Sequence, residues 1–406
     1  MKSANRKGLF QILIALFCVY CVAVCQFKVS ACTALLMQNF GINNMEVGFL
    51  TSATSIAGII LAIPVGTLIA KYGFKIIGLI SLCACAIGSI LGFVTNSYEV
   101  LLFSRVLEGI AVGSMFTLVP SLISVVAEGK IRTFFVSVFS CYVGVGQIIV
   151  FVTTNLVVNQ SNPESYKKLW LLTTILLIIC IVLWSAFIKP IQFGPVSQDN
   201  PLKIRGFYKY PSLWIITLLM FSFVSIYKGV TTYTMPYVYS IGLDLVFSNS
   251  ISTIRALVGI VTSIIVGLVI ASFSVKRLHI AGILICVLNF FAIFSMWSYT
   301  TQSMALVSLV VVGITEAATF AIFTSMTPYL LKDIKLVGIT NGFITTGKSI
   351  AILSIPYISG GIIDSFGFGP LTFVYFIIGV VCLILSIVLY VYHKRTERQE
   401  SVLEVE

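Results

Sequence analysis

Charged residues are scarce in this chain of 406 residues: Asp, Glu, Lys and Arg together make up 10% of it, whereas 58% of the residues are hydrophobic. A soluble globular domain carries about 25% charged residues. A soluble protein of this composition would expose far more apolar surface than it could bury. The scarcity of charge therefore excludes an ordinary water-soluble enzyme or binding domain, and it indicates that lipid surrounds most of the chain.

The chain also lacks the residue patterns expected of an enzyme or a metal site. It contains only two histidines, no G-x-G-x-x-G and no H-E-x-x-H. Its ten cysteines all fall inside apolar runs, and the C-x-x-C formed by Cys18 and Cys21 has no second pair elsewhere. No sizeable soluble domain is present. We therefore expect no enzymatic activity, no cofactor and no metal.

Acidic residues are fewer than basic ones, 14 against 25, which gives a formal charge of +11. In a soluble protein this excess would suggest nucleic acid as a partner. Here the basic residues form short clusters between apolar runs, a pattern typical of loops beside anionic lipid headgroups. The lipid bilayer, and not nucleic acid, is the expected partner.

Long apolar runs are abundant, and twelve of them are long enough to cross a bilayer, which requires about 20 residues. Backbone polar groups must be satisfied internally in lipid, so each run is predicted to form a helix. The run nearest the N-terminus is too long for the apolar core of a signal peptide and is interpreted as a first span. The predicted spans are 9–37, 46–70, 76–95, 99–126, 133–157, 168–188, 210–239, 247–272, 278–297, 302–330, 337–361 and 370–392.

Basic residues are concentrated in alternate loops. The N-terminus, every second loop and the C-terminal tail carry most of them, while the opposite loops carry only Lys167 and Lys168. The positive-inside rule then places both termini in the cytoplasm and requires an even number of spans. An eleven-span arrangement would put the basic tail outside and is rejected. We predict a multi-pass protein of the cell inner or plasma membrane.

The two halves of the chain resemble each other at an offset near 200 residues. Four features recur in the same order: a lysine within a span, an outer-loop sequence with a glycine, a glycine that ends the second span, and a glutamate twelve residues before a proline. The matched positions are Lys28 and Lys228, 40–43 and 241–244, Gly66 and Gly267, and Glu108–Pro120 and Glu316–Pro328. The predicted organisation is an N-terminal six-helix half (1–188), a cytoplasmic linker (189–209), a C-terminal six-helix half (210–393) and a cytoplasmic tail (394–406).

Two sequence motifs resemble those of the major facilitator superfamily. The stretch from Gly66 to Lys75 is similar to the family's loop motif G-x-L-a-D-r-x-G-r-k, with matches at Gly66, Leu68, Gly73 and Lys75. The span-four motif R-x-x-q-G-x-g matches at Arg105 and Gly109, with Glu108 in place of its glutamine. The resemblance implies twelve helices in two six-helix repeats around a central cavity. It also implies a conformational role for Gly66, Gly73 and Lys75.

The chain departs from the family pattern at two places. Ala70 stands where the loop motif has an aspartate that helps to latch the halves together, and the fainter second copy has Ala271 at that position. Span five contains Gly144 and Gly146 without the proline of the antiporter motif. The first difference removes the latch carboxylate, and the second disfavours a drug exporter.

Charged side chains within the spans are the candidate functional residues, because a charge at mid-bilayer costs at least about 2.5–3.5 kcal/mol and usually faces a cavity or a partner. Lys348 lies about eleven residues into its span, among small or polar neighbours, and is predicted to line the cavity rather than form a structural pair. Arg255 is predicted to line it as well. Lys28 and Lys228 either line the cavity or extend to the outer interface.

The acidic residues in the spans have different expected partners. Arg105 and Glu108 are one helical turn apart, which predicts a local ion pair of structural importance. Glu316 has no local partner, so it either neutralises Lys348 or Arg255 or binds a proton. Tyrosines near Lys228, among them Tyr233, and Gln147 in span five are candidates for further contacts, although a tyrosine at a membrane boundary is more often an interfacial anchor.

The spans carry a surplus of positive charge, which favours anions. Basic residues in spans eight and eleven also resemble, in position only, those of oxalate/formate-type members of the superfamily. The leading hypothesis is therefore a monomeric secondary transporter that moves a small anionic solute by alternating access, with protons or a counter-ion as possible coupling partners. The alternative is a transporter of neutral or cationic compounds, including proton-coupled drug efflux, in which Glu108 and Glu316 dominate. The predicted substrate contacts are Lys348, Arg255, Lys28, Lys228 and Tyr233.

Overall fold

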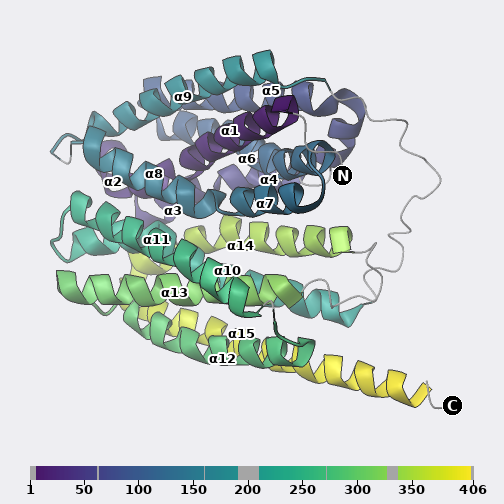
Figure 1. Ribbon diagram of the computed structural model, residues 1–406. Coiled ribbons are helices and arrows are strands. Elements are labelled where there is room, and N and C mark those ends of the chain that lie inside the picture. The colour runs from purple at the N-terminus through teal and green to yellow at the C-terminus, as the bar shows by residue number, and fades with distance from the viewer. Residues whose placement is uncertain are drawn as a thin grey trace.

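The computed structural model describes residues 6–61, 64–159, 161–190, 210–270, 272–326 and 337–403, and its regular structure over these ranges is helical (Figure 1). Eleven helices are long and apolar enough to cross a membrane, and a bent pair, Phe134–Ser140 with Tyr142–Val157, makes a possible twelfth. These helices coincide with the twelve apolar runs of the sequence. The predicted all-α polytopic fold is confirmed.

The helices form two groups, one above the other in Figure 1, that correspond to the two halves of the chain. The N-terminal half contains α1 (Arg6–Ala31), α2 (Thr33–Phe40), α3 (Asn44–Ser52), α4 (Thr54–Leu61), α5 (Pro64–Val94), α6 (Tyr98–Val126), α7 (Gly129–Ser140), α8 (Tyr142–Val157), the short 3-10 helix η1 (Pro163–Ser165) and α9 (Tyr166–Phe187). The C-terminal half contains α10 (Pro211–Ser240), α11 (Leu245–Ile270), α12 (Val275–Ser295), α13 (Gln302–Met326), α14 (Val337–Phe366) and α15 (Gly369–Leu403). Most of the predicted linker, Ala271 and Pro328 lie outside the described residues.

Several span boundaries differ from those expected from the sequence. The first run breaks at Cys32 into α1 and α2, and α15 continues to Leu403, so most of the predicted tail extends the last helix. The second and third spans join in α5 through a kink at Gly73, where φ is 78° and ψ is 165°. A side chain strains the backbone at such a positive φ, which explains the glycine at this point of the loop motif.

The repeat of the two halves is preserved in detail at the turns between their first and second spans. Gly41 (φ 64°) and Gly242 (φ 80°) both adopt the left-handed conformation. Two residues later, the side chain of Asn43 accepts a hydrogen bond from the Glu46 backbone N–H, and Oδ1 of Asp244 accepts one from Phe247 N at 2.6 Å. Each half thus turns on a glycine and then caps its next helix with an Asn or Asp side chain.

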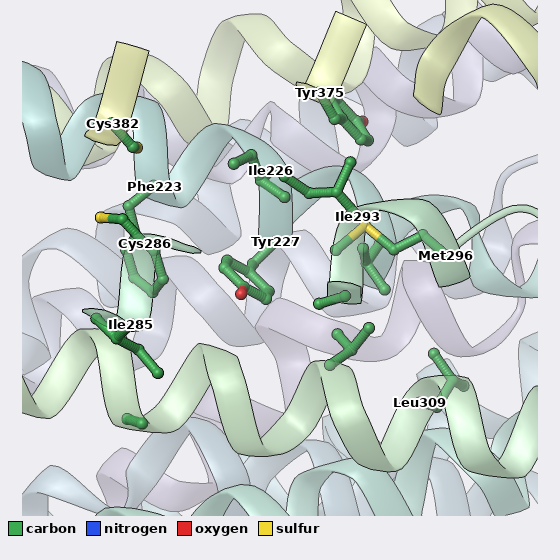
Figure 2. Packing of buried hydrophobic residues seen from close by; sticks show 14 of the residues in the cluster. Phe223, Ile226, Tyr227, Ile285, Cys286, Ile293, Met296, Leu309, Tyr375 and Cys382 are labelled. Carbon is green, nitrogen blue, oxygen red and sulfur yellow. The ribbon is translucent and has the colours of Figure 1, made fainter. Parts of the chain in front are cut away.

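The two halves contact each other along two seams. In the first seam α14 packs against α3 and α4, and in the second α11 packs against α8. Within the C-terminal half a large apolar core joins α10, α12 and α15; Figure 2 shows Tyr227 and Phe223 of α10 near Cys286 of α12. Helices α10, α11 and α14 therefore connect this core to the contact between the halves.

Candidate functional site

A buried ion-pair cluster lies inside the N-terminal half. Lys28 Nζ of α1 is 2.5 Å from Oε1 of Glu108 on α6, and Arg105 pairs with the other carboxylate oxygen of Glu108. All three side chains are 0% exposed. The local pair of Arg105 with Glu108 is present as expected, and Lys28 joins it.

Further hydrogen bonds engage both cations of this cluster, although Nε of Arg105 has no partner among the described residues. Lys28 Nζ also donates to Ser89 Oγ at 3.0 Å and lies 4.5 Å from the centre of the Trp170 ring. Arg105 donates to the carbonyl oxygens of Cys25 and Gln26. Lys28 is therefore packed inside its own half, which differs from both positions considered from the sequence. The partners come from distant segments, so sequence spacing gave no signal for them.

A second ion pair lies in the C-terminal half and is more open. Arg255 Nη1 of α11 is 2.9 Å from Glu316 Oε2 of α13, and its Nη2 donates to Thr231 Oγ1 of α10 at 3.1 Å. The Glu316 side chain is 33% exposed. Gly313 permits this close approach, because a Cβ there would lie 2.7 Å from the Arg255 carbonyl oxygen. Of the alternatives for Glu316, the structure selects Arg255 as its ion-pair partner.

Two lysines of the C-terminal half have no carboxylate partner among the described residues. Lys228 of α10 is 9% exposed, and its Nζ lies 6.0 Å from the ring centre of Phe27 on α1, in the other half. Lys348 Nζ of α14 lies 5.3 Å from the ring centre of Phe320 on α13. The described part of the chain offers neither ammonium a hydrogen bond or ion pair; an aromatic face is the contact of each. These two cations can accept an anionic partner.

Gln147 of α8 lies at the level of Arg255 across the second seam. Asn155 Nδ2, near one end of α8, donates to the carbonyl oxygen of Val246 on α11 at 3.1 Å. Near the other end, a Cβ on Gly144 would lie 2.7 Å from Ile260 of α11. The two helices are therefore antiparallel, and this register sets Gln147 opposite Arg255. Its amide is buried and can both donate and accept.

The tyrosines considered from the sequence are engaged elsewhere. Tyr233 OH donates toward the carbonyl oxygens of Asn44 (3.0 Å) and Pro356, so it joins the halves at the first seam. Tyr227 OH is bonded to Asn289 Oδ1 at 2.5 Å inside the C-terminal core. Neither is an interfacial anchor, and the Tyr233 hydroxyl is occupied by protein carbonyls.

The loop-motif residues are placed by their backbone. Gly66 lies in the first turn of α5, Gly73 forms its kink, and the carbonyl oxygen of Lys75 accepts a hydrogen bond from Trp184 Nε1 at 3.1 Å. This anchors the start of the third span to α9.

The sequence also contains a nucleotide-binding pattern. Residues 342–349 spell G-x-x-x-x-G-K-S, the letters of a phosphate-binding P-loop. That loop works because its backbone N–H groups are free to face phosphates, and it follows a strand. Here the residues lie within the continuous helix α14. Their amides are used by the helix, so the match has no nucleotide-binding geometry. Nor do three or more His, Cys, Asp or Glu side chains in the described ranges gather as a metal site.

Comparison with known proteins gives a consistent family. The model of the Major Facilitator Superfamily matches residues 13–326 and 242–405. A probable metabolite transport protein of Saccharomyces cerevisiae is 28% identical over 137 residues, which are 34% of this chain and 27% of that protein. The yeast vacuolar protein sorting-associated protein 73 is 34% identical over 90 residues, 22% of this chain and 18% of its own. The matched segments thus span less than a third of either yeast protein.

Solved structures share the whole fold. A bacterial homolog of the human lysosomal transporter Spinster, inward-facing and unoccupied, superposes with a TM-score of 0.79 at 16% identity and covers 97% of this chain and 98% of its own. The nucleoside transporter NupG gives 0.75 at 14% identity, over 95% and 99% of the two chains. A D-xylose–proton symporter gives 0.73 at 16% identity, over 95% and 97%.

Proposed function

Because this chain belongs to the Major Facilitator Superfamily, it is a multi-pass membrane protein and a secondary transporter, and we propose that its solute is a small organic or inorganic anion. One observation carries the proposal: Lys228 and Lys348 are ammonium groups within the spans, and no carboxylate among the described residues partners them. A cation in such a position normally faces a partner or a cavity. An anionic solute supplies the missing partner.

The charge balance around these lysines supports this assignment. Arg255 adds a third cation, and Glu316 is the one carboxylate bonded to the three within the described ranges. Like charges held within one bundle repel each other more strongly than they would in water. The net positive field repels cations and concentrates anions. Binding an anion lowers this repulsion, which provides the energy that couples occupancy to movement of the halves.

We assign the solute contacts to both halves. Lys228, Lys348 and Arg255 bind the charged group from the C-terminal half, and Gln147 contacts the solute from α8 because it lies level with Arg255. A solute held in this way spans the second seam. Its binding then favours closure of one half upon the other, as alternating access requires.

Glu316 is the proposed coupling carboxylate. It is partly exposed, and its other oxygen, Oε1, makes no hydrogen bond within the described residues. A proton on Glu316 would weaken its pairing with Arg255 and leave the guanidinium fork for the solute. Proton and anion would then bind together. Glu108, by contrast, is wholly engaged with Lys28 and Arg105 and has no such role.

The alternative is a transporter of neutral or cationic compounds. It is favoured by the partial exposure of Glu316, since an exposed carboxylate within the spans can also bind a cation. Two proteins of the same fold are described as nucleoside and D-xylose transporters. In this alternative Glu316 binds solute or proton and the lysines serve the fold.

For orientation and oligomeric state we keep the expectations drawn from the sequence as proposals. We propose that both termini face the cytoplasm, because the basic residues of the sequence are concentrated in the loops that share their side of the predicted spans. We also propose that the chain acts as a monomer, since the two halves of one chain form the complete site.

The proposal is tested by Lys348→Ala and Lys228→Ala in liposomes. Each is expected to lower uptake of anions by at least tenfold while the purified protein keeps the wild-type melting temperature. Lys168→Ala is the matched control, because Lys168 is an exposed lysine on α9, far from the seams. A screen for stabilisation by anions, sugars, nucleosides and lipophilic cations identifies the solute class. Normal transport by both variants, or stabilisation by cations alone, would contradict the anion assignment.

A further inference from the structure

The first seam closes the bundle at the end remote from the chain termini, here called the distal end. Both turns described above, Gly41–Asn43 and Gly242–Asp244, lie at this end, as does the C-terminal end of α14 (Figure 1). The α3 helix of the N-terminal half begins there beside the last turns of α14. Hydrogen bonds between the halves gather at this place.

Asp364 of α14 caps α3 across the seam. Its Oδ1 accepts hydrogen bonds from the backbone N–H of Asn44 at 3.0 Å and from Asn44 Nδ2 at 2.9 Å, and its Oδ2 accepts one from Met45 N at 2.9 Å. The first N–H groups of a helix have no partner within the helix, and the helix dipole favours a negative charge there. Asp364 supplies both the acceptors and the charge from the other half of the protein.

The same seam is closely packed. A Cβ on Gly360 would lie 2.4 Å from the Asn44 carbonyl oxygen, and one on Gly48 would lie 2.3 Å from the Pro356 carbonyl oxygen. Tyr233 adds its hydroxyl to the Asn44 carbonyl at 3.0 Å. The two halves therefore approach each other closely at these glycines, and the Tyr233 hydroxyl fills the space beside Gly48. The cap and the packing both require α3 and α14 to stay together.

The repeat supplies a comparison at the second seam. There α8 ends beside the start of α11, and Asn155 Nδ2 donates to the carbonyl oxygen of Val246 and to Ser250 Oγ. These are uncharged bonds to groups that do not need a helix cap. Asp364 thus gives the first seam a charge-assisted contact that the second seam lacks among the described residues.

We propose that Asp364 is the latch of the distal gate, a residue of the transport cycle whose bonds to α3 must break each time that end opens. The loop motif at the opposite end carries Ala70 in place of the carboxylate that would hold the halves there. Among the described residues, the balance of charged contacts between the halves therefore favours the state closed at the distal end. This inference rests on alternating access alone, and it holds whichever solute is carried.

The test measures the width of the distal end in the full chain. Spin labels are attached at Asn162 in the N-terminal half and at Thr301 in the C-terminal half, which are both exposed. The background is a variant that lacks the native cysteines and still transports. Double electron–electron resonance then measures the distance between the two labels, which reports the width of the distal end. Wild type is expected to show mainly the short distance. Asp364→Ala is expected to raise the ratio of open to closed populations about tenfold, because charge-assisted bonds are lost. Asp364→Asn, which keeps one acceptor oxygen and packs like the native residue, is expected to give a smaller rise.

Asp244→Ala is the matched control. Asp244 is also a carboxylate at the distal end that caps a helix, through its bond to Phe247 N, but both groups belong to the C-terminal half. Its loss should leave the distance distribution unchanged. A wild-type distribution in Asp364→Ala, or an equal opening in Asp244→Ala, would overturn the latch. If Asp364→Ala does not fold, the Asp364→Asn distribution decides: the wild-type ratio overturns the proposal and a raised ratio supports it.

Discussion

The two halves of this protein share a sequence pattern, yet they use their buried charges differently. In the N-terminal half Lys28 and Arg105 share Glu108, and all three side chains are 0% exposed. In the C-terminal half the corresponding Lys228 has an aromatic ring as its neighbour, and the corresponding Glu316 is taken by Arg255. Equivalent positions thus form a closed cluster in one half and an open one in the other.

The difference separates a structural role from a functional one. Buried ions are stable when their charges are paired and most of their donors are bonded. The Glu108 cluster meets that condition through its ion pairs and its hydroxyl and carbonyl partners, with Arg105 Nε as the one unpartnered donor of the cluster within the described residues. Lys228 and Lys348 leave the requirement unmet within the described chain. A transporter needs this second kind of site, because a fully satisfied cluster has nothing to offer a solute. The C-terminal half therefore contributes the charge of the proposed site, and the N-terminal half gives α1 and α8 a rigid support.

The largest expected effect is a loss of stability in Glu108→Gln that Glu316→Gln does not show. The first leaves Lys28 and Arg105 buried without a counter-charge, which costs about 3–5 kcal/mol. The second removes one bond of a partly exposed pair, and Arg255 keeps Thr231. Thermal unfolding in detergent and the yield of monodisperse protein should fall sharply for Glu108→Gln alone, whereas Glu316→Gln should change transport. Equal stability of the two variants would contradict the assignment of a structural role to Glu108 and a functional role to Glu316.

Much of the fold could be predicted because it depends on local composition. Apolar runs of membrane length located the eleven spanning helices and the bent pair of α7 and α8. The repeated Gly-x-Asn/Asp turns at 41–43 and 242–244 are short enough to be recognised in the sequence. Breaks such as the one at Cys32 were not predicted. They depend on packing between helices, and an uninterrupted apolar run carries no mark of them.

The candidate site was predictable in its residue types but only partly in its pairings. Arg105 and Glu108 are three residues apart in the sequence, and their ion pair was predicted. Lys28 and Glu108 are 80 residues apart, and their ion pair was not predicted. Asp364 lies at the end of a span, and nothing in the sequence indicated that Asn44 would be its hydrogen-bond partner. Long-range pairs depend on how helices are rotated and shifted, and a single sequence does not record this.

An intermediate effect is expected from Arg255→Lys. The change keeps the positive charge but removes the planar fork that bonds Glu316 and Thr231 at once. In the proposed site the same fork binds the solute, and losing one of its bonds to the solute is worth about 1.4 kcal/mol. The concentration of solute for half-maximal transport should therefore rise about tenfold. Arg132→Lys is the control, because Arg132 is exposed on α7 outside both clusters. Unaltered solute dependence in Arg255→Lys would show that only the charge of Arg255 is used.

The smallest expected effect is a loss of stability at the two glycine turns, where the backbones of the halves have the same conformation. Gly41→Ala and Gly242→Ala each place a methyl group where no atom lies within 4 Å, so their cost is the backbone alone, at φ values of 64° and 80°. A left-handed conformation costs an ordinary residue about 1 kcal/mol, and both variants should lose that much stability. Gly267→Ala, also open but helical, should be neutral or slightly stabilising. Equal losses at the two turns, set against unequal losses at Glu108 and Glu316, would show that the repeat kept its backbone geometry while its buried charges diverged. Unequal losses at the turns would mean that divergence extends to the backbone as well.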